Sequence, residues 1–414
     1  MIFSGKVFGL KMLLTKCKYF KILISAIFAV CLAMPVFAIN ETDITDDDLE
    51  SNLIFNEDEI IELQTDKPRI TDKIFNKKDK EKETDKTKSS VLDLFKSSGY
   101  TFESGIIKNQ KIHYFFHGGI DWTAQTHEDL STTTAMSTNE LHLETLFADN
   151  KTSLMISYNF TKDLDSANKF FQKFSGLYVS HKFNDNQLVE IGETRVPIGY
   201  EGGISTSNIK LFSRSQLSRN LGNYYSTGIK NIGKYKYGNY NIGIYDGSRS
   251  FRNNFKGYEF SALAAITPLE KFDGKYGHLQ IGGSIDNGNS DNSYTVMGGH
   301  ILYNYKKFYT DFEYLYADGL SGNHYGRGRA HGFYTTVGYF IKPKIEVLAR
   351  YDFYQNLSNE NVSQEYSAGL NYYFTPKIKL MFQYIYAMKD TSSNPSHKIY
   401  LGANFSTDYL FDLL

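Results

Sequence analysis

The stretch KIEVLARYDFY, Lys344–Tyr354, alternates between two kinds of residue. One set is apolar or aromatic: Ile345, Val347, Ala349, Tyr351 and Phe353. The other set is mostly polar: Glu346, Leu348, Arg350 and Asp352. Because successive side chains of a β-strand point to opposite faces, this period of two predicts a strand with one apolar and one polar face. The pattern recurs in EYSAGLNYYF, KIKLMFQYIYAM and KIYLGANF, which all follow before residue 406.

The lengths of the connections between such strands separate a membrane barrel from a soluble sandwich. Short links such as FADNKT, KFNDNQ, NYKKFY, FIKPKI and YFTPKI alternate with longer polar links such as YDGSRSFRNNFKG, YADGLSGNHYGRGRAHG and YQNLSNENVSQ. Short turns at one end and long loops at the other, between strands of about ten residues, are typical of outer-membrane barrels. The aromatic residues beside the turns and loops fit the interfacial girdles of such barrels.

The composition supports an all-β membrane protein. The chain has 32 Tyr, 31 Phe and 33 Gly but only 7 Pro, and aromatic residues with Gly and Asn punctuation favour strands. Its mean hydropathy of -0.39 is too polar for a helical membrane protein. We therefore predict a transmembrane antiparallel β-barrel of about sixteen strands within residues 101–414. Its lumen would hold water, because only a barrel of about eight strands fills its interior with side chains.

The N-terminal part of the chain has a different character. Lysines precede an apolar run, Ile22–Met34, and Val36-Phe37-Ala38 follows it, which is the pattern of a secretory signal peptide over residues 1–38. Both cysteines, Cys17 and Cys31, fall inside this segment, so disulfides do not stabilise the exported chain. Residues 39–100 are charged and polar, and we expect them to be largely disordered.

One strand and the loop after it carry a family resemblance. In VEIGETRVPIGYEGG, Val189–Gly203, the charged residues Glu190, Glu193 and Arg195 are explained if one face of the strand meets a water-filled lumen or its rim. The stretch resembles the signature of the phosphate-selective porins O and P. The motif positions are Val189, Ile191, Gly192, Val196, Pro197, Gly199 and Glu201. FHGGIDWTAQ (residues 116–125) and YYSTGIKNIGKYKYGNYNIGIYDGS (residues 224–248) are also similar to parts of that family.

The resemblance covers roughly residues 100–406 and implies a trimeric pore for passive diffusion of anions, phosphate in particular. It also implies that the loop beginning at Pro197 folds into the lumen and narrows it. The chain departs from the usual pattern at its C-terminus, where STDYLFDLL replaces a terminal aromatic residue. The last strand ends at Phe405 with a tail after it, or it runs on to Phe411.

The candidate pore residues are cations, because a guanidinium presents a planar fork of donors that suits phosphate or carboxylate. Most arginines of the exported chain lie in long loops, where solute would enter. The candidates for the constriction and for anion contacts are Arg195, Lys210, Arg214, Arg219, Arg249, Arg252, Arg327, Arg329 and Arg350. The overall charge balance, 45 Lys+Arg against 46 Asp+Glu, opposes strong selectivity. An alternative is that these cations form structural ion pairs with nearby acids, among them Asp311, Glu313 and Glu346.

Other functions find less support in the residues. Neither a Gly-x-Ser-x-Gly elbow nor a zinc-binding His-Glu-x-x-His helix occurs, so we expect no enzyme, no metal and no cofactor. The expected partners are outer-membrane lipid, small anionic or neutral solutes, the barrel-assembly machinery and two further copies of the chain in a homotrimer, but no nucleic acid. A channel for sugars or other neutral nutrients and an exported adhesin or binding protein remain alternatives. We expect the protein in the outer membrane of a two-membraned bacterium.

Overall fold

The computed structural model describes residues 107–125, 131–160, 174–247, 257–289, 292–320, 327–375, 378–390 and 395–411. The predicted signal peptide (1–38) and polar segment (39–100) lie outside the described residues. The strands are β1 (Ile107–Gln125), β2 (Ser131–Phe147), β3 (Thr152–Asn159), β4 (Phe174–Asn184), β5 (Gln187–Arg195), β6 (Tyr225–Tyr235), β7 (Gly238–Tyr245), β8 (Tyr258–Ile266), β9 (His278–Asn289), β10 (Ser293–Tyr305), β11 (Phe308–Asp318), β12 (Arg329–Lys342), β13 (Ile345–Asn356), β14 (Asn361–Thr375), β15 (Ile378–Lys389) and β16 (Ser396–Phe411).

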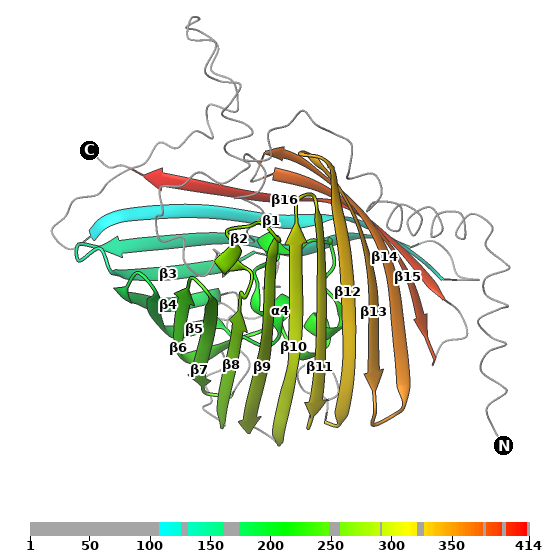
Figure 1. Cartoon of the computed structure of the whole chain (residues 1–414), viewed down its shortest axis with the longest axis horizontal. Coiled ribbons are helices and arrows are strands. Elements are labelled where there is room, and N and C mark those ends of the chain that lie inside the picture. The colour runs from blue at the N-terminus through cyan, green and yellow to red at the C-terminus, as the bar shows by residue number, and fades with distance from the viewer. Residues whose placement is uncertain are drawn as a thin grey trace, which may run out of the picture. The chain divides into compact units, whose positions relative to one another are not determined.

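These strands form one closed antiparallel barrel (Figure 1). Each strand pairs with its neighbours in the sequence, and β1 closes the sheet by pairing with β16 from Gln110 opposite Phe411 to Gln125 opposite Ser396. Closure leaves no edge whose backbone groups would lack partners in lipid. The predicted sixteen-stranded barrel is confirmed. The last strand does run on to Phe411, and Phe405 lies within it.

The strand faces follow the alternation of the sequence. On β13, Glu346, Arg350 and Asp352 are at most 5% exposed and point inward, whereas Val347 and Ala349 point outward. On β14, Leu370 is 44% exposed on the outer face. An apolar outer face and a polar inner face are what a barrel in lipid requires.

The connections differ at the two ends of the barrel. Links of two to four residues join β2 to β3, β4 to β5, β6 to β7, β10 to β11 and β12 to β13, and we call this the short-turn end. At the opposite, long-loop end, one connection is shorter than predicted. β13 and β14 extend through most of YQNLSNENVSQ and leave only residues 357–360 between them. Glu360 adopts φ 57, which closes this tight turn and allows the two strands to gain further ladder hydrogen bonds.

The described helices are short. α4 (Tyr200–Gly203), the 3-10 helix η6 (Thr206–Asn208) and α5 (Gln216–Leu221) lie in the connection between β5 and β6, and η7 (Glu270–Phe272) lies between β8 and β9. In the described part of the chain, none of the helices has both the length and the apolar character needed to cross a membrane. Three of the four therefore belong to a single connection, which is the site described next.

Candidate functional site

The connection between β5 and β6, residues 196–224, lies inside the barrel, and we call it the lumenal loop. Its backbone meets the wall on nearly every side. Gly199 N donates to Ser284 Oγ on β9 at 3.1 Å, His117 Nε2 on β1 donates to Phe212 O at 2.9 Å, and Asn404 Nδ2 on β16 donates to Thr206 O at 3.2 Å. A loop in this position must narrow the lumen.

The sequence explains why the strand ends and the chain turns inward here. Pro197 has no N–H for the sheet, and it restricts Val196 to an extended conformation. Val196 N still donates to Tyr224 O at 3.0 Å, which closes the base of the loop. Gly199 has φ 66, and a Cβ at this position would collide with the Glu313 carboxylate. The glycine of the motif is therefore required by both its backbone angle and its close approach to β11.

One side of the lumenal loop forms an apolar core with the barrel wall. Ile198, Leu217 and Leu221 are at most 1% exposed. They pack in one cluster with inward-facing residues of the strands, among them Tyr245, Tyr294, Val296, Leu315, Ala317, Ala330, Tyr334 and Tyr354. Burial of a leucine or isoleucine side chain is worth about 1.5–3 kcal/mol. The loop is therefore docked as part of the folded barrel.

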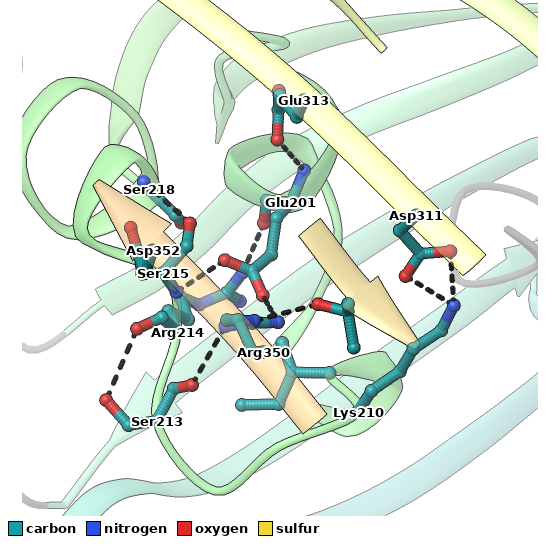
Figure 2. Close-up of polar contacts among 12 residues, drawn as sticks. Glu201, Lys210, Ser213, Arg214, Ser215, Ser218, Asp311, Glu313, Arg350 and Asp352 are labelled. Carbon is teal, nitrogen blue, oxygen red and sulfur yellow. Dashed lines mark hydrogen bonds and ion pairs between the residues drawn. The ribbon is translucent and has the colours of Figure 1, made fainter. Parts of the chain in front are cut away.

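A buried ion pair fixes the first turn of the loop (Figure 2). Arg350 Nη2 on β13 donates to Glu201 Oε1 at 2.6 Å, and Ser215 N donates to Glu201 Oε2 at 2.6 Å. Both charged side chains are 3% exposed. Burial opposes ionisation of Glu201, but Arg350 and Arg214 outweigh it and hold the pKa of this carboxyl below its ordinary value. The carboxylate therefore stays charged.

A second carboxylate receives the backbone of the same turn. Glu313 on β11 accepts hydrogen bonds from Tyr200 N and from Glu201 N, the latter at 3.2 Å. Figure 2 shows Glu313 and Arg350 on opposite sides of Glu201. The turn is thus held from two different strands.

Lys210 anchors the middle of the loop. Its ammonium lies 2.5 Å from Asp311 Oδ2 on β11 and 4.0 Å from the centre of the Tyr309 ring. The lysine side chain is 9% exposed. Burial lowers the pKa of Lys210, and the Asp311 carboxylate opposes that shift. This ion pair is the one at the right of Figure 2.

Arg214 cross-links the loop to itself. Its guanidinium donates to Glu201 O, to Ile204 O at 2.8 Å and to Thr206 Oγ1 at 3.3 Å. The residue is 8% exposed. All three acceptors precede Arg214 in the same loop, so the arginine fixes the curve of the chain.

One segment of the loop is less buried than the rest. Residues 203–208, with the sequence GISTSN, are half-buried or exposed, in contrast to the buried residues that flank them. None of these six residues is charged. The side chains of residues 205–208 carry hydroxyl and amide groups, and Arg214 contacts this segment through Ile204 O and Thr206 Oγ1.

The long-loop side of the lumenal loop borders a pocket of about 380 Å³. We call this pocket the vestibule, and its lining residues are Thr123, Gln216, Arg219, Asn220, Glu365, Ala387, Lys389, Ser396 and Lys398. Arg219 on α5 pairs with Glu365 on β14 at 2.7 Å and keeps 34% of its side chain exposed. Among the described residues, neither Lys389 nor Lys398 forms an ion pair.

The match to a known family covers most of the barrel. A model of the phosphate-selective porin O and P family matches residues 145–293 and 282–406. The chain belongs to this family. The porin is thus an outer-membrane protein whose barrel forms a channel for passive diffusion. No curated protein sequence matches it.

Solved structures with the same fold are porins and channels. The anion-selective porin of Comamonas acidovorans is 12% identical, with a TM-score of 0.53, over 72% of this chain and 99% of that one. The outer-membrane channel DcaP of Acinetobacter baumannii is 14% identical, with a TM-score of 0.52, over 74% and 99%. A trimer form of OmpT of Vibrio cholerae is 11% identical, with a TM-score of 0.50, over 72% and 100%. These identities are so low that the likeness shows the fold alone.

The structure separates the predicted pore residues of the porin into groups. Lys210, Arg214 and Arg350 lie in the lumen but are buried against carboxylate or carbonyl partners. Arg219 borders the vestibule. Arg195 lies over the Tyr225 ring and donates to its hydroxyl at 2.6 Å. The remaining predicted cations are Arg327 and Arg329, exposed at the long-loop end of β12, and Arg249 and Arg252, outside the described residues.

Two acids and a glycine of β5 pack against the neighbouring strands or inside the barrel. Glu190 pairs with Lys230 on β6 at 2.5 Å, and Glu193 is 3% exposed. Gly192 has φ 134, and a Cβ there would collide with Leu177 O on β4. The sequence analysis missed Lys389 and Lys398 as site residues. The alternation could have found them, because Lys389 and Lys398 occupy inward-facing positions of β15 and β16 at the long-loop end.

Metal and enzyme chemistry find no further support. In the ranges that the structure describes, no group of three or more His, Cys, Asp or Glu side chains is placed to hold a metal ion. The family and the fold are those of a channel.

Proposed function

We propose that this porin conducts small anions in preference to cations and that the vestibule is where they are drawn in. The observation that carries the proposal is the charge of the vestibule lining, with Arg219, Lys389 and Lys398 against one acid, Glu365. Because Arg219 pairs with Glu365, the two lysines supply the excess positive charge.

The other groups of the vestibule suit the same solutes. Gln216 and Asn220 carry amide donors, and Thr123 and Ser396 carry hydroxyls. Phosphate and carboxylate accept hydrogen bonds from such groups and from ammonium and guanidinium. Asp121, which accepts from Thr123 Oγ1 at 3.0 Å, reduces the local excess of positive charge. A preference for anions is therefore expected, and strict exclusion of cations is not.

In this proposal the buried cations have a different role from the one expected of them. Lys210, Arg214 and Arg350 hold the lumenal loop in place, and Arg219 alone among the loop cations meets solute. Replacing Lys210, Arg214 and Arg219 together by glutamate would undock the loop, because Lys210 would be exchanged for a carboxylate facing Asp311. The vestibule lysines provide the cleaner test.

The test is the reversal potential of the purified porin in planar bilayers under a salt gradient. The wild-type channel should favour chloride over potassium, and Lys389→Glu/Lys398→Glu should lower or reverse that preference. A matched control is Lys306→Glu/Lys307→Glu at the short-turn end, which should leave it unchanged. A cation-preferring or neutral wild-type channel, or a vestibule variant identical to wild type, would refute the proposal. Sugar uptake by liposomes without ion preference would favour the neutral-nutrient alternative.

We also propose that the porin assembles as a trimer. The support is the OmpT structure, which is described as a trimer form and shares the fold. Light scattering on the porin in detergent, corrected for bound detergent, should give three times the mass of one chain. A monomeric mass would exclude the trimer.

A further inference from the structure

Three pairs of facing residues form a charged array on the inner face of β1 and β2, which lie side by side in Figure 1. The pairs are Lys111 with Glu144, His113 with His142, and Phe115 with Glu140. We call this array the β1–β2 ladder. It faces the lumen, because His117 on the same face of β1 contacts the lumenal loop. The anion preference proposed above makes no use of it.

Both histidines of the ladder have carboxylate partners and access to water. His142 Nε2 lies 2.9 Å from Glu140 Oε2, and His113 Nε2 lies 3.8 Å from Glu144 Oε2. Lys111 Nζ lies 3.9 Å from the same Glu144 oxygen. The His113 and His142 side chains are 16% and 24% exposed. Each imidazole can therefore exchange a proton with lumenal water and is stabilised by a nearby anion when it is charged.

The neighbouring strands add few charges. On β3, opposite the ladder, the inward residues are Met155, Ser157 and Asn159, and Asn159 donates to Glu140 Oε1 at 3.0 Å. On β16 the backbone of Asp408 pairs with that of His113. Arg195, beyond β3, attracts the Glu140 carboxylate. Imidazole is the side-chain type of the ladder whose ordinary titration range spans neutral pH, since carboxyl groups ordinarily titrate near pH 4 and lysine near pH 10.

We propose that His113 and His142 set the ion preference of the channel according to pH. Each imidazole that gains a proton adds one positive charge beside Lys111, Glu140 and Glu144, so protonation of both makes the charge of the ladder more positive by two. An imidazole side chain ordinarily changes charge between about pH 8 and about pH 5, so acidification over that interval is expected to make the ladder more positive. Charged side chains that line a pore bias which ions pass. Acidification therefore shifts the channel toward anions, whatever its preference at neutral pH.

The experiment measures the chloride-to-potassium permeability ratio of the purified porin in planar bilayers as the pH is lowered. In wild type the ratio should rise about three- to tenfold between about pH 8 and about pH 5, as expected for one or two unit charges acting across about 6 Å of partly screened water. His113→Gln/His142→Gln should show a clearly smaller rise than wild type. His181→Gln is the matched control, because His181 lies on the outer face of β4 between the exposed Val179 and Phe183.

A second variant keeps the test decisive if the double variant does not assemble. His142→Lys carries a permanent charge, so its ratio at high pH should be higher than that of wild type and should change less with pH. A wild-type ratio that is independent of pH would overturn the proposal. So would a pH response in His113→Gln/His142→Gln that is as large as in wild type, or one that His181→Gln abolishes. If the channel has no anion preference at neutral pH but still responds to pH, only the vestibule proposal is refuted.

Discussion

Glu201→Gln should loosen the lumenal loop without unfolding the barrel. The substitution keeps the size of the side chain and one acceptor oxygen, but it leaves Arg350 charged and 3% exposed without its carboxylate. Removing one partner of a buried ion pair costs about 3–5 kcal/mol. We take about 3 kcal/mol, because Arg350 keeps Thr336 Oγ1 at 2.9 Å and Ser213 O at 3.3 Å as acceptors. The free energy of docking falls by about 3 kcal/mol, so the equilibrium constant for opening of the loop rises about a hundredfold.

Hydrogen exchange of the detergent-solubilised porin measures that equilibrium directly. The amide of Ser215 donates to the Glu201 carboxylate and that of Gln216 to Asp352 at 2.7 Å, so peptides spanning residues 198–218 report docking. Their exchange should accelerate by about two orders of magnitude in Glu201→Gln. Strand peptides should be unchanged, and Glu270→Gln, at η7 outside the lumenal loop, should leave both sets unchanged.

The result that would refute this reasoning is loop exchange within about threefold of wild type, since that corresponds to less than about 1 kcal/mol. A double-mutant cycle adds a second check. Glu201→Gln/Arg350→Gln should recover part of the loss, because neither charge is then buried alone. Strict additivity of the two single substitutions would show that the pair does not anchor the loop.

Three further predictions concern pH, topology and the N-terminal segment. The pKa of Glu201 is lowered in the docked loop, so its contribution to docking is complete above the ordinary carboxyl value and is lost as the pH falls through the docked value. Current noise should therefore rise as the pH falls into that acidic range, and noise that stays constant there would contradict this. An epitope tag in SGNHYGRG, residues 321–328, should be detected on intact cells, and detection only after permeabilisation would invert the topology. Protease should remove residues 39–100, which we propose are not part of the packed barrel, and should leave a heat-modifiable barrel; a chain that resists cleavage there would contradict this.

The alternation of the sequence predicted the strands and their faces, because the pleat gives every strand a period of two, and the unequal connections favoured a barrel over a sandwich. Glu346, Arg350 and Asp352 lie on the inner face as their positions indicate. The same rule fails for Val296 and Leu315, which are apolar, 1% exposed and inward-facing. A periodic pattern shows which residues share a face, but it does not show that a loop elsewhere in the chain will cover that face.

The candidate site was less predictable for the same reason. The loop cations and the lumenal acids could each be named, and ion pairing between them was one of the alternatives. The actual pairs join residues far apart, with 101 positions between Lys210 and Asp311 and 149 between Glu201 and Arg350. Only the closed sheet brings them together. The vestibule likewise combines α5 with β1, β14, β15 and β16, which no local motif connects.

The contacts at the tip of the lumenal loop also fix when the constriction can form during assembly. The tip meets His117 on β1, 95 residues before Phe212, and Asn404 on β16, 198 residues after Thr206. These are the first and last strands, and contacts of such sequence separation form late because of the entropy of loop closure. An intermediate with an open β1–β16 seam offers the loop only part of its final binding surface. Sealing of the β1–β16 seam and docking of the lumenal loop are therefore coupled, so the lumen is already narrowed when the barrel closes.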